Sequence, residues 1–292
     1  MQAFDYIPAK TVSEAVALLA EKGDQARALS GGTDLIVQVR EGRRRLELMV
    51  DIKDIPEVNE LSYHLETGLR LGAAVPCYKI YADEAICAAY PGLIDAVSIV
   101  GGIQIQGRAS VGGNLCNASP AADTIPALIV LEAICVIAGS NGVREIPVEN
   151  FCTGPGRTVL EKGEFLLSFK IPPPKKNSGA HYLRFIPRNE MDIAVVGAGA
   201  SVILNDAKTA FVSARIALGA VAPTPLFAEE AGALLVGKEI SDEVINAAAE
   251  AAKAVARPIS DMRGTAEQRR HLVGALTRRA LTGAIQRAKG GQ

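Results

Sequence analysis

The chain has 292 residues, of which 49% are hydrophobic, and its 31 Lys and Arg residues oppose 32 Asp and Glu residues. This length allows two or three domains with a substantial core. The net charge of −1 provides no field that would attract nucleic acid or an anionic membrane. No apolar run reaches the roughly 18 residues of a membrane span, and residues 1–30 lack a secretory signal pattern. We therefore expect a cytoplasmic protein with no membrane span and no nucleic-acid partner.

The five cysteines share no C-x-x-C spacing: they are Cys77, Cys87, Cys116, Cys135 and Cys152. An odd number of scattered cysteines is typical of a reducing compartment and disfavours a zinc site or a self-contained iron–sulfur cluster. We expect them to be small buried side chains. Cys116 is the exception to watch, because it lies in a glycine-rich segment.

The first 56 residues read as a small α/β unit. Thr11 followed by Glu14 forms a capping box that opens a helix ending at Gly23. A strand at residues 26–29, a short helix at 35–39 and a strand at 48–52 follow. We assign residues 1–56 to a first domain.

A second α/β region is predicted at residues 57–174. It begins with a strand at residues 69–75 and contains a helix with Ser119 as N-cap and Pro120 as first residue, followed by a strand at 133–138. Residues 172–179 contain three prolines and are the best domain boundary in the chain.

The remaining residues, 175–292, are predicted to form an α+β domain. Strands are expected at residues 194–204 and 213–218. Ser241 can cap a helix that ends before Pro258, and Thr265 with Gln268 opens a last helix toward Arg287. The arginines of that helix, Arg269 among them, are expected mostly on a solvated face.

Gly197 and Gly199 have the G-x-G spacing that begins a dinucleotide-binding fingerprint. A genuine fingerprint opens a helix and carries an acid about 20 residues later. Here the pattern continues as a strand through Leu204, and residues 217–222 contain no acid. We therefore interpret these glycines as small residues that pack a strand against a helix.

Two other glycine-rich segments indicate a phosphate ligand: residues 28–35, A-L-S-G-G-T-D-L, and residues 109–120, A-S-V-G-G-N-L-C-N-A-S-P. Glycines allow bare main-chain N–H groups to approach phosphate oxygens. Two such segments suggest a ligand with two phosphates. The first lacks the Lys of a Walker loop, so a dinucleotide such as FAD fits better than ATP.

These segments resemble the FAD-binding medium subunit of the molybdenum hydroxylases, a family that includes flavin subunits of bacterial xanthine dehydrogenase and aerobic carbon monoxide dehydrogenase. Further matches are residues 71–74 (L-G-A-A), 163–172 (G-E-F-L-L-S-F-K-I-P), 191–194 (M-D-I-A) and 219–225 (G-A-V-A-P-T-P). The resemblance implies a two-subdomain FAD-binding fold of the vanillyl-alcohol-oxidase (PCMH-like) type. A C-terminal domain with an antiparallel sheet and helices would follow it.

The resemblance also implies which residues bind the cofactor. The pyrophosphate loops would be Leu29, Ser30, Gly31, Gly32, Thr33, Asp34, Leu35 and Ile36, with Ser110, Val111, Gly112, Gly113 and Asn114. The remaining residues of the implied site are Ala74, Val100, Asp123, Leu166, Leu167 and Arg184.

Specific roles are implied for some of these residues. Leu166 or Leu167 would pack against the isoalloxazine, and Asp123 would hydrogen-bond the flavin, although simple helix N-terminal electrostatics is its alternative. Arg184 would stand near the ring, with a solvated surface arginine as the alternative. The chain departs from relatives at Val100, which replaces an aromatic residue, and at Arg108, where the basic residue is displaced by two positions.

The implied function is electron transfer. In the family, a large subunit with a molybdenum cofactor hydroxylates the substrate and a small subunit with two [2Fe-2S] clusters carries electrons. FAD then passes the electrons to NAD⁺ or another acceptor, and we expect a dimer of heterotrimers. We expect neither catalytic residues nor metal ligands in this chain, since its histidines are scattered without a companion motif.

The identity of the holoenzyme stays open at this stage. We prefer a xanthine dehydrogenase-like holoenzyme, because residues 152–156 and 221–225 resemble its flavin subunits. A carbon monoxide, nicotinate or other heteroaromatic dehydrogenase, and a free-standing FAD oxidase of the related fold, are the alternatives.

Overall fold

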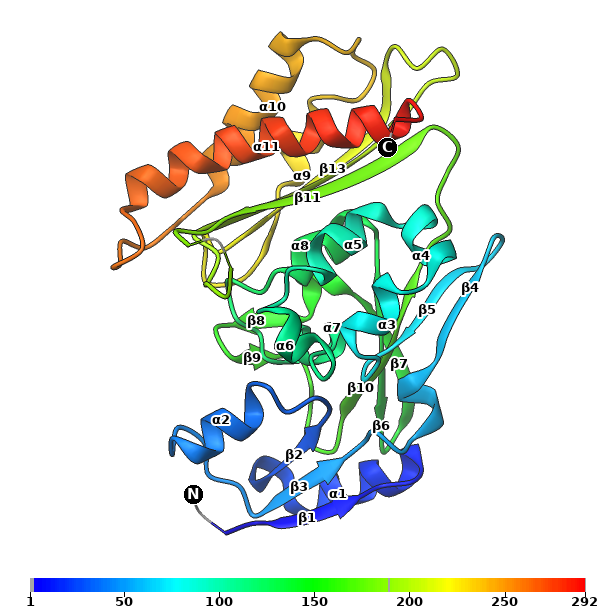
Figure 1. Cartoon of the computed structure of the whole chain (residues 1–292), viewed down its shortest axis with the longest axis vertical. Helices are drawn as coiled ribbons and strands as arrows, with labels where there is room; N and C mark the ends of the chain where they lie inside the picture. The colour runs from blue at the N-terminus through cyan, green and yellow to red at the C-terminus, as the bar shows by residue number, and fades with distance from the viewer. Residues whose placement is uncertain (1–2, 189, 292) are drawn as a thin grey trace.

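The computed structural model describes residues 3–188 and 190–291. Three main sheets follow one another along the long axis, each built from a separate stretch of chain (Figure 1). A parallel three-stranded sheet lies at one end, a five-stranded antiparallel sheet in the middle, and a four-stranded antiparallel sheet at the other end. This arrangement confirms the predicted α+β class.

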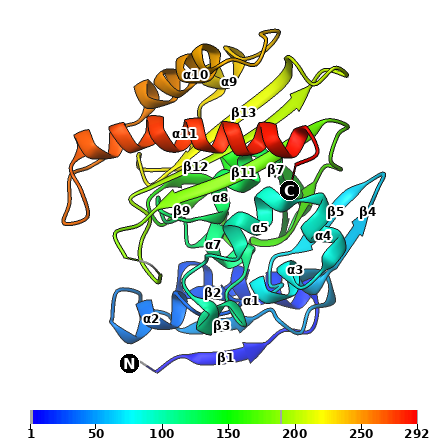
Figure 2. The ribbon, with the colours of Figure 1, turned by 45° about the horizontal axis from the view of Figure 1, so that its top comes forward.

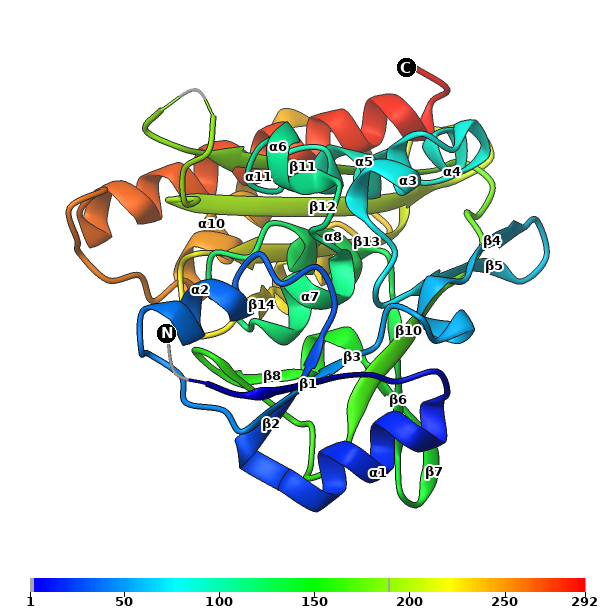
Figure 3. The same cartoon turned by 60° about the horizontal axis from the view of Figure 1, so that its bottom comes forward.

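The first sheet has the order β1-β3-β2, with β1 (Asp5–Pro8), β2 (Ala26–Leu29) and β3 (Leu48–Asp51). Helix α1 (Val12–Lys22) packs against it, and α2 (Leu35–Arg40) follows β2 (Figure 3). The predicted cap is confirmed, because the Glu14 N–H donates to Thr11 Oγ1 at 3.2 Å. Strand β1 was not predicted, since three of its four residues are exposed and carry no alternating pattern.

The middle sheet has the order β4-β5-β10-β6-β7. Its strands are β4 (Leu61–His64), β5 (Gly68–Gly72), β6 (Ile134–Gly139), β7 (Gly142–Pro147) and β10 (Phe165–Ile171). The central strand, β10, is almost wholly buried, which explains its nearly continuous apolar sequence. Alternation along the strand places Leu166 in the middle core and Leu167 in the core of the first layer. The pairing of β10 with β6 shifts register between Leu166 and Ser168.

Short elements cover the middle sheet. They are the helices α3 (Cys77–Tyr81), α4 (Glu84–Ala89), α5 (Pro91–Val97), α6 (Ile103–Gln106), α7 (Val111–Cys116) and α8 (Thr124–Val130), and the small strands β8 (Cys152–Gly154) and β9 (Arg157–Thr158). Three one-turn 3₁₀ helices complete these two layers, at Gly23–Gln25, Pro56–Asn59 and Val148–Asn150.

The prediction that Ser119 and Pro120 open a helix is wrong. Helix α8 begins five residues after Ser119, at Thr124, and Asp123 stands at its N-cap without a side-chain capping bond. The Ser119 hydroxyl instead accepts a hydrogen bond from the Ala121 N–H at 3.3 Å, within a local turn.

The second glycine-rich segment contains a helix, α7. Ser110 caps α7 and its Oγ accepts a hydrogen bond from the Gly113 N–H at 3.0 Å. Helix α7 ends before Ala118, which has a left-handed φ of 47°. The chain therefore reverses between α7 and α8 rather than continuing as one helix.

The C-terminal layer is a sheet of β11 (Ser178–Phe185), β12 (Val196–Leu204), β13 (Phe211–Gly219) and β14 (Leu226–Phe227). Helices α10 (Asp242–Val255) and α11 (Ala266–Ala288) lie on its outer side, and Figure 2 shows α11 running across the strands. The short helix α9 (Glu229–Ala233) packs on β13. The capping predictions at Ser241 and Thr265 are confirmed, because each hydroxyl accepts the expected main-chain hydrogen bond.

The interpretation of Gly199 as a packing residue is also confirmed. Strand β12 continues through it, and a Cβ placed there would lie 3.0 Å from the Pro126 carbonyl oxygen of α8. The expectation for Arg269 is wrong. Its guanidinium is buried, where Nη1 donates to the Val195 carbonyl at 2.9 Å and Nη2 pairs with Asp261 at 2.7 Å.

A fork-shaped ion pair joins the C-terminal layer to the middle layer. Arg287 of α11 pairs with Asp95 of α5 and also donates to the Ala180 carbonyl oxygen at 2.7 Å. Asp95 accepts a further hydrogen bond from the Tyr182 N–H at 3.1 Å. No helix in the described ranges is long and apolar enough to cross a membrane.

A second bidentate pair supports the edge of the middle sheet and provides a stability test. Both Glu164 carboxylate oxygens accept hydrogen bonds from Arg144 of β7 at 2.7 Å. We expect Glu164→Gln to lower the free energy of unfolding by about 1 kcal/mol at pH 7. Urea unfolding measures this difference.

The pH dependence of that difference follows from the pKa of Glu164. The hydrogen bonds from Arg144 hold this pKa below its ordinary value. A depressed pKa in the folded state gives stability that is present above the ordinary pKa and is lost as pH falls through the folded one. The difference in unfolding free energy between wild type and Glu164→Gln should therefore shrink between pH 7 and about pH 3.5. A difference that stays constant would contradict a stabilising ion pair between Glu164 and Arg144.

Candidate functional site

A cavity of about 780 Å³ opens between the first and middle layers, and we call it the central cavity. Four stretches of chain contribute to its lining: residues 19–44, 100–123, 153–166 and 191–194. Both glycine-rich segments are among them. The fold thus brings two segments that are far apart in sequence into the wall of one cavity.

The two glycine-rich segments are in direct contact. Ser30 Oγ and Ser110 Oγ lie 3.0 Å apart within hydrogen-bond distance. Arg108 Nε donates to the Gly31 carbonyl oxygen at 3.0 Å, so the displaced arginine holds the first segment to the second. A Cβ at Gly31 would lie 1.9 Å from the Arg108 carbonyl oxygen, so only glycine permits this approach.

The first segment carries unused main-chain donors on residues that line the cavity. The N–H groups of residues 31–35 donate to no other group in the described part of the chain. Gly32 has a φ of +77°, which turns this run of amides. Consecutive free N–H groups on a concave surface bind anions, and the phosphates of a dinucleotide fit this arrangement.

The second segment completes this anion cradle. Gly112 and Gly113 are in the first turn of α7 and line the cavity. A Cβ at Gly112 would lie 2.4 Å from the Ala73 carbonyl oxygen, so this glycine allows α7 to pack against the end of β5. Asn114 fixes α8 to α7, because its Oδ1 accepts a hydrogen bond from Thr124 Oγ1 at 2.7 Å. We call residues 30–35 and 110–113 the glycine cradle.

A buried charge cluster adjoins another part of the cavity. Asp123 lines the cavity, accepts a hydrogen bond from Tyr182 Oη at 3.1 Å and pairs with Arg184 Nη1 at 2.6 Å. Only 8% of the Arg184 side chain is exposed, which rules out the solvated-surface alternative. Burial raises the pKa of Asp123 to about 6, against the opposing effect of Arg184 and Tyr182.

Most of the predicted site residues line the cavity. These are Leu29, Ser30, Gly31, Gly32, Thr33, Asp34, Leu35, Val100, Ser110, Gly112, Gly113, Asn114, Asp123 and Leu166. The other predicted residues do not: Ile36 is exposed, Ala74, Val111 and Leu167 are buried in cores, and Arg184 reaches the cavity only through Asp123.

Sequence reasoning missed several polar residues of the cavity. Arg27, Gln38, Arg44 and Asn117 line it, and a hydrogen bond of 2.9 Å from Gln38 Nε2 to Asn117 Oδ1 joins α2 to the end of α7. Arg27, Gln38 and Arg44 belong to no glycine motif, whereas Asn117 is part of the second glycine-rich segment but was not assigned to the site. The one available signal was an arginine, Arg27, inside an otherwise apolar strand of the first sheet.

The cysteines mostly behave as expected. Cys77 and Cys135 are buried, whereas Cys87, Cys116 and Cys152 are partly exposed, and all five are unpaired. Cys116 lines the cavity, but burial raises the pKa of its thiol to about 12, so it stays protonated at neutral pH.

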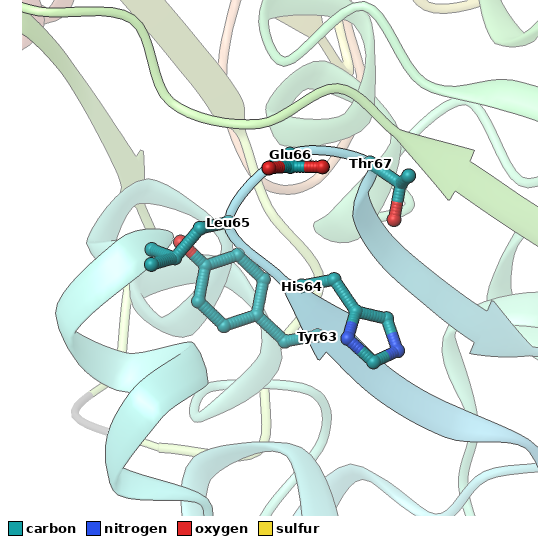
Figure 4. Close-up of a pocket in the computed structure, with 5 residues that line it drawn as sticks. All are labelled: Tyr63, His64, Leu65, Glu66 and Thr67. Atoms are coloured by element: carbon teal, nitrogen blue, oxygen red, sulfur yellow. The ribbon is translucent and has the colours of Figure 1, made fainter.

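The tip of the β4–β5 hairpin forms a second, shallow depression. Its lining consists of five consecutive residues, 63–67, all from this one hairpin (Figure 4). Groups of three or more His, Cys, Asp or Glu side chains suited to a metal ion do not occur in the residues that the structure covers. The central cavity is therefore the candidate binding site.

Two protein families match the chain. Residues 2–174 match the family described as "FAD binding domain in molybdopterin dehydrogenase", and residues 181–284 match "CO dehydrogenase flavoprotein C-terminal domain". Among curated relatives, the xanthine dehydrogenase FAD-binding subunit of Escherichia coli O157:H7 is 32% identical over 98% of this chain and 97% of the relative. The carbon monoxide dehydrogenase medium chain of Afipia carboxidovorans is 34% identical over 98% of both chains.

Solved structures confirm the predicted fold. A chain of the reconstituted CO dehydrogenase from Oligotropha carboxidovorans superposes with a TM-score of 0.93 at 31% identity, covering 98% of this chain and 99% of that one. A chain of quinoline 2-oxidoreductase from Pseudomonas putida 86 gives 0.90 at 30% identity, with 98% of both chains covered.

The buried cluster makes a prediction for Arg184→Leu. Removing one partner of a buried ion pair leaves Asp123 with an uncompensated charge, so we expect the free energy of unfolding to fall by about 3 kcal/mol at pH 7. Urea unfolding of the purified chain measures this loss. Lys176→Gln, which breaks a solvated pair with Asp206, is the control and should leave the unfolding midpoint unchanged.

The loss of unfolding free energy caused by Arg184→Leu should depend on pH. Without Arg184, burial would raise the pKa of Asp123 further, and a pKa raised by folding gives stability that is present at low pH and lost as pH rises. The Arg184→Leu protein should therefore be closer to wild type at pH 5 than at pH 7.5. An equal loss at both values would argue against a role for the Asp123 charge.

Proposed function

This chain belongs to the family of FAD-binding subunits of the molybdenum hydroxylases, and from that membership we propose that it passes electrons from [2Fe-2S] clusters of a small partner subunit to NAD⁺ or another acceptor. The observation that supports this role most directly is the glycine cradle, whose residues line the central cavity and include a run of N–H groups with no acceptor in the described part of the chain. Bound FAD supplies a carrier that exchanges electrons singly with clusters and in pairs with an acceptor.

The residues present fit this cofactor. The N–H groups of residues 31–35 and the start of α7 would hold its two phosphates, and Leu166 provides an apolar wall for the flavin ring. Asp123 is paired with Arg184, so it offers a carboxylate oxygen without adding a net charge beside the flavin. We propose these residues as the FAD site.

We propose that substrate hydroxylation takes place on a large subunit with a molybdenum cofactor, in a dimer of heterotrimers. The names of the relatives support separate subunits, since one is a FAD-binding subunit and another a medium chain. A xanthine dehydrogenase-like holoenzyme remains our preference, with carbon monoxide or heteroaromatic dehydrogenases as alternatives, because relatives of both named kinds are about equally identical.

We also propose the three segments 1–56, 57–174 and 175–292 as domains, because each contains one of the three main sheets. A cytoplasmic location is proposed from the five unpaired cysteines, which suit a reducing compartment.

The glycine cradle predicts the effect of Gly31→Ala. The added methyl group would collide with the Arg108 carbonyl and force the two segments apart. We expect FAD affinity to fall about 100-fold, because the loss of two charge-assisted hydrogen bonds of roughly 1.5 kcal/mol each corresponds to that factor. Absorbance of the flavin retained after gel filtration measures this change.

Gly107→Ala is the matched control for Gly31→Ala. Gly107 has an ordinary φ of −68°, and a Cβ there would meet nothing within 4 Å. We expect its FAD content to equal that of wild type. Equal FAD contents in wild type, Gly31→Ala and Gly107→Ala would refute the proposal that the glycine cradle binds FAD.

Electron transfer is tested by co-expressing the chain with its neighbouring gene products. We expect flavin absorbance in the chain alone and substrate-dependent bleaching of that absorbance only in the complex. Absence of flavin from both the isolated chain and the co-expressed complex would refute the proposal that this chain carries FAD. Substrate turnover by the isolated chain would favour the free-standing oxidase.

A further inference from the structure

Tyr182 of β11 is a buried tyrosine whose hydroxyl contacts the wall of the central cavity. The residue is 3% exposed, and its ring packs against Ala96 of α5 and Ala127 of α8. A phenol hydroxyl in such apolar surroundings needs a hydrogen-bond partner. That partner is Asp123, a residue of the cavity lining, whose Oδ1 accepts the bond at 3.1 Å. The C-terminal layer therefore reaches an acid of the cavity through this hydroxyl.

Asp123 does not use its carboxylate for its own helix. It stands at the N-cap of α8, where an aspartate commonly accepts a hydrogen bond from an N–H of the first turn, but its side chain makes no such bond. Asn114 Oδ1 accepts the Thr124 N–H instead, at 3.3 Å. The Asp123 carboxylate is thus left for partners that come from another layer.

Two donors from β11 fix both oxygens of this carboxylate. Tyr182 Oη donates to Oδ1, and Arg184 Nη1 donates to Oδ2 at 2.6 Å. A carboxylate held at one oxygen can turn about its Cβ–Cγ bond, whereas one held at both oxygens cannot. Arg184 balances the charge, so the tyrosine hydroxyl adds orientation. Each oxygen keeps a further lone pair for a ligand in the cavity.

Gly197 of β12 makes room for the tyrosine ring. Strands β11 and β12 lie side by side, and Gly197 pairs with Arg184, two residues along β11 from Tyr182 (Figure 2). A Cβ at Gly197 would lie 2.7 Å from Tyr182 Oη and 3.3 Å from its Cε2. A side chain at this position would therefore displace the hydroxyl that Asp123 accepts from.

The main chain of Tyr182 is held as firmly as its hydroxyl. Its N–H donates to Asp95 Oδ2 of α5 at 3.1 Å, and the same carboxylate forms the fork-shaped pair with Arg287 of α11. Tyr182 is thus fixed at both ends, by Asp95 at the main chain and by Asp123 at the phenol. The docking of the C-terminal layer on the middle layer determines where the hydroxyl lies.

We propose that Tyr182 is a positioning residue for the bound flavin: together with Arg184 it fixes the Asp123 carboxylate on the cavity wall, and this arrangement sets the reduction potential of FAD. The inference rests on the proposed function, since it requires FAD in the central cavity beside Asp123. It adds a residue of the C-terminal layer that acts on the flavin through another side chain.

The direction of the effect follows from charge. Reduction makes a flavin more negative, so a carboxylate oxygen beside it opposes reduction, even when the carboxylate as a whole is balanced by Arg184. A hydroxyl that donates to the carboxylate withdraws part of its negative charge. Tyr182 therefore makes the flavin easier to reduce, and loss of its hydroxyl should make reduction harder.

The test compares Tyr182→Phe with wild type, both as the full chain saturated with FAD. The variant keeps the packed ring and removes only the donor. In a redox titration against an indicator dye, the ratio of oxidised to reduced FAD at a fixed potential should rise about tenfold, which for a two-electron couple is a midpoint about 30 mV more negative.

Gly197→Ala tests the same hydroxyl without removing it. The added methyl group displaces Tyr182 Oη from Asp123, so the midpoint potential should again become more negative. This second variant keeps every hydrogen-bonding group of the cluster, and it separates the position of the hydroxyl from its presence.

Tyr90→Phe is the matched control. It removes another buried tyrosine hydroxyl, which donates to the Pro172 carbonyl oxygen at 3.0 Å and is not part of the cavity lining. Both Tyr→Phe variants should lower the midpoint of urea unfolding, because each removes a buried hydrogen bond. Only Tyr182→Phe should change the flavin potential, which a merely structural tyrosine would leave unchanged.

Three outcomes would overturn the inference: a midpoint potential in Tyr182→Phe that equals or exceeds the wild-type value, an equal shift in Tyr90→Phe, or an unchanged potential in Gly197→Ala. A wild-type chain that binds no FAD would instead refute the proposed function itself, so the two failures are distinguishable.

Discussion

The central cavity depends on the close approach of two main chains, at Gly31 and at Arg108. A methyl group cannot fit between them, since a Cβ at Gly31 would lie 1.9 Å from the Arg108 carbonyl oxygen. The contact between Ser30 and Ser110 then aligns two segments that are 80 residues apart. Because the N–H groups of residues 31–35 donate to no group within residues 3–188 and 190–291, the approach leaves those donors for a ligand.

The charged side chains in and beside the cavity are arranged in two different ways. Asp123 and Arg184 neutralise each other in a buried pair, with Tyr182 as a third partner, so this part of the site is polar but carries no net charge. Arg27 and Arg44 are only half-buried and have no carboxylate bonded to them within the residues described. The first arrangement is a buried structural support, whereas the second places positive charge on the cavity wall.

Local signals predicted the helices that are stabilised locally. Thr11, Ser241 and Thr265 each cap the helix that follows, because the hydroxyl and the N–H that it accepts from are three residues apart in sequence. The start of α8 was predicted wrongly because the carboxylate at its N-cap, Asp123, is engaged by Tyr182 and Arg184 of β11. Those partners are about 60 residues away, beyond the reach of a local pattern.

The sequence by itself determined the family, the FAD cofactor and most of the cavity lining, because glycine motifs must lie where main-chain N–H groups meet a ligand. Only the tertiary structure decided the positions of Arg27, Arg44 and Arg184. The first two line the cavity and the third is buried against Asp123, and apart from the apolar neighbours of Arg27 nothing local distinguishes them from surface arginines. Charged side chains acquire their roles from partners that folding brings from other elements, and a one-dimensional pattern does not record those partners.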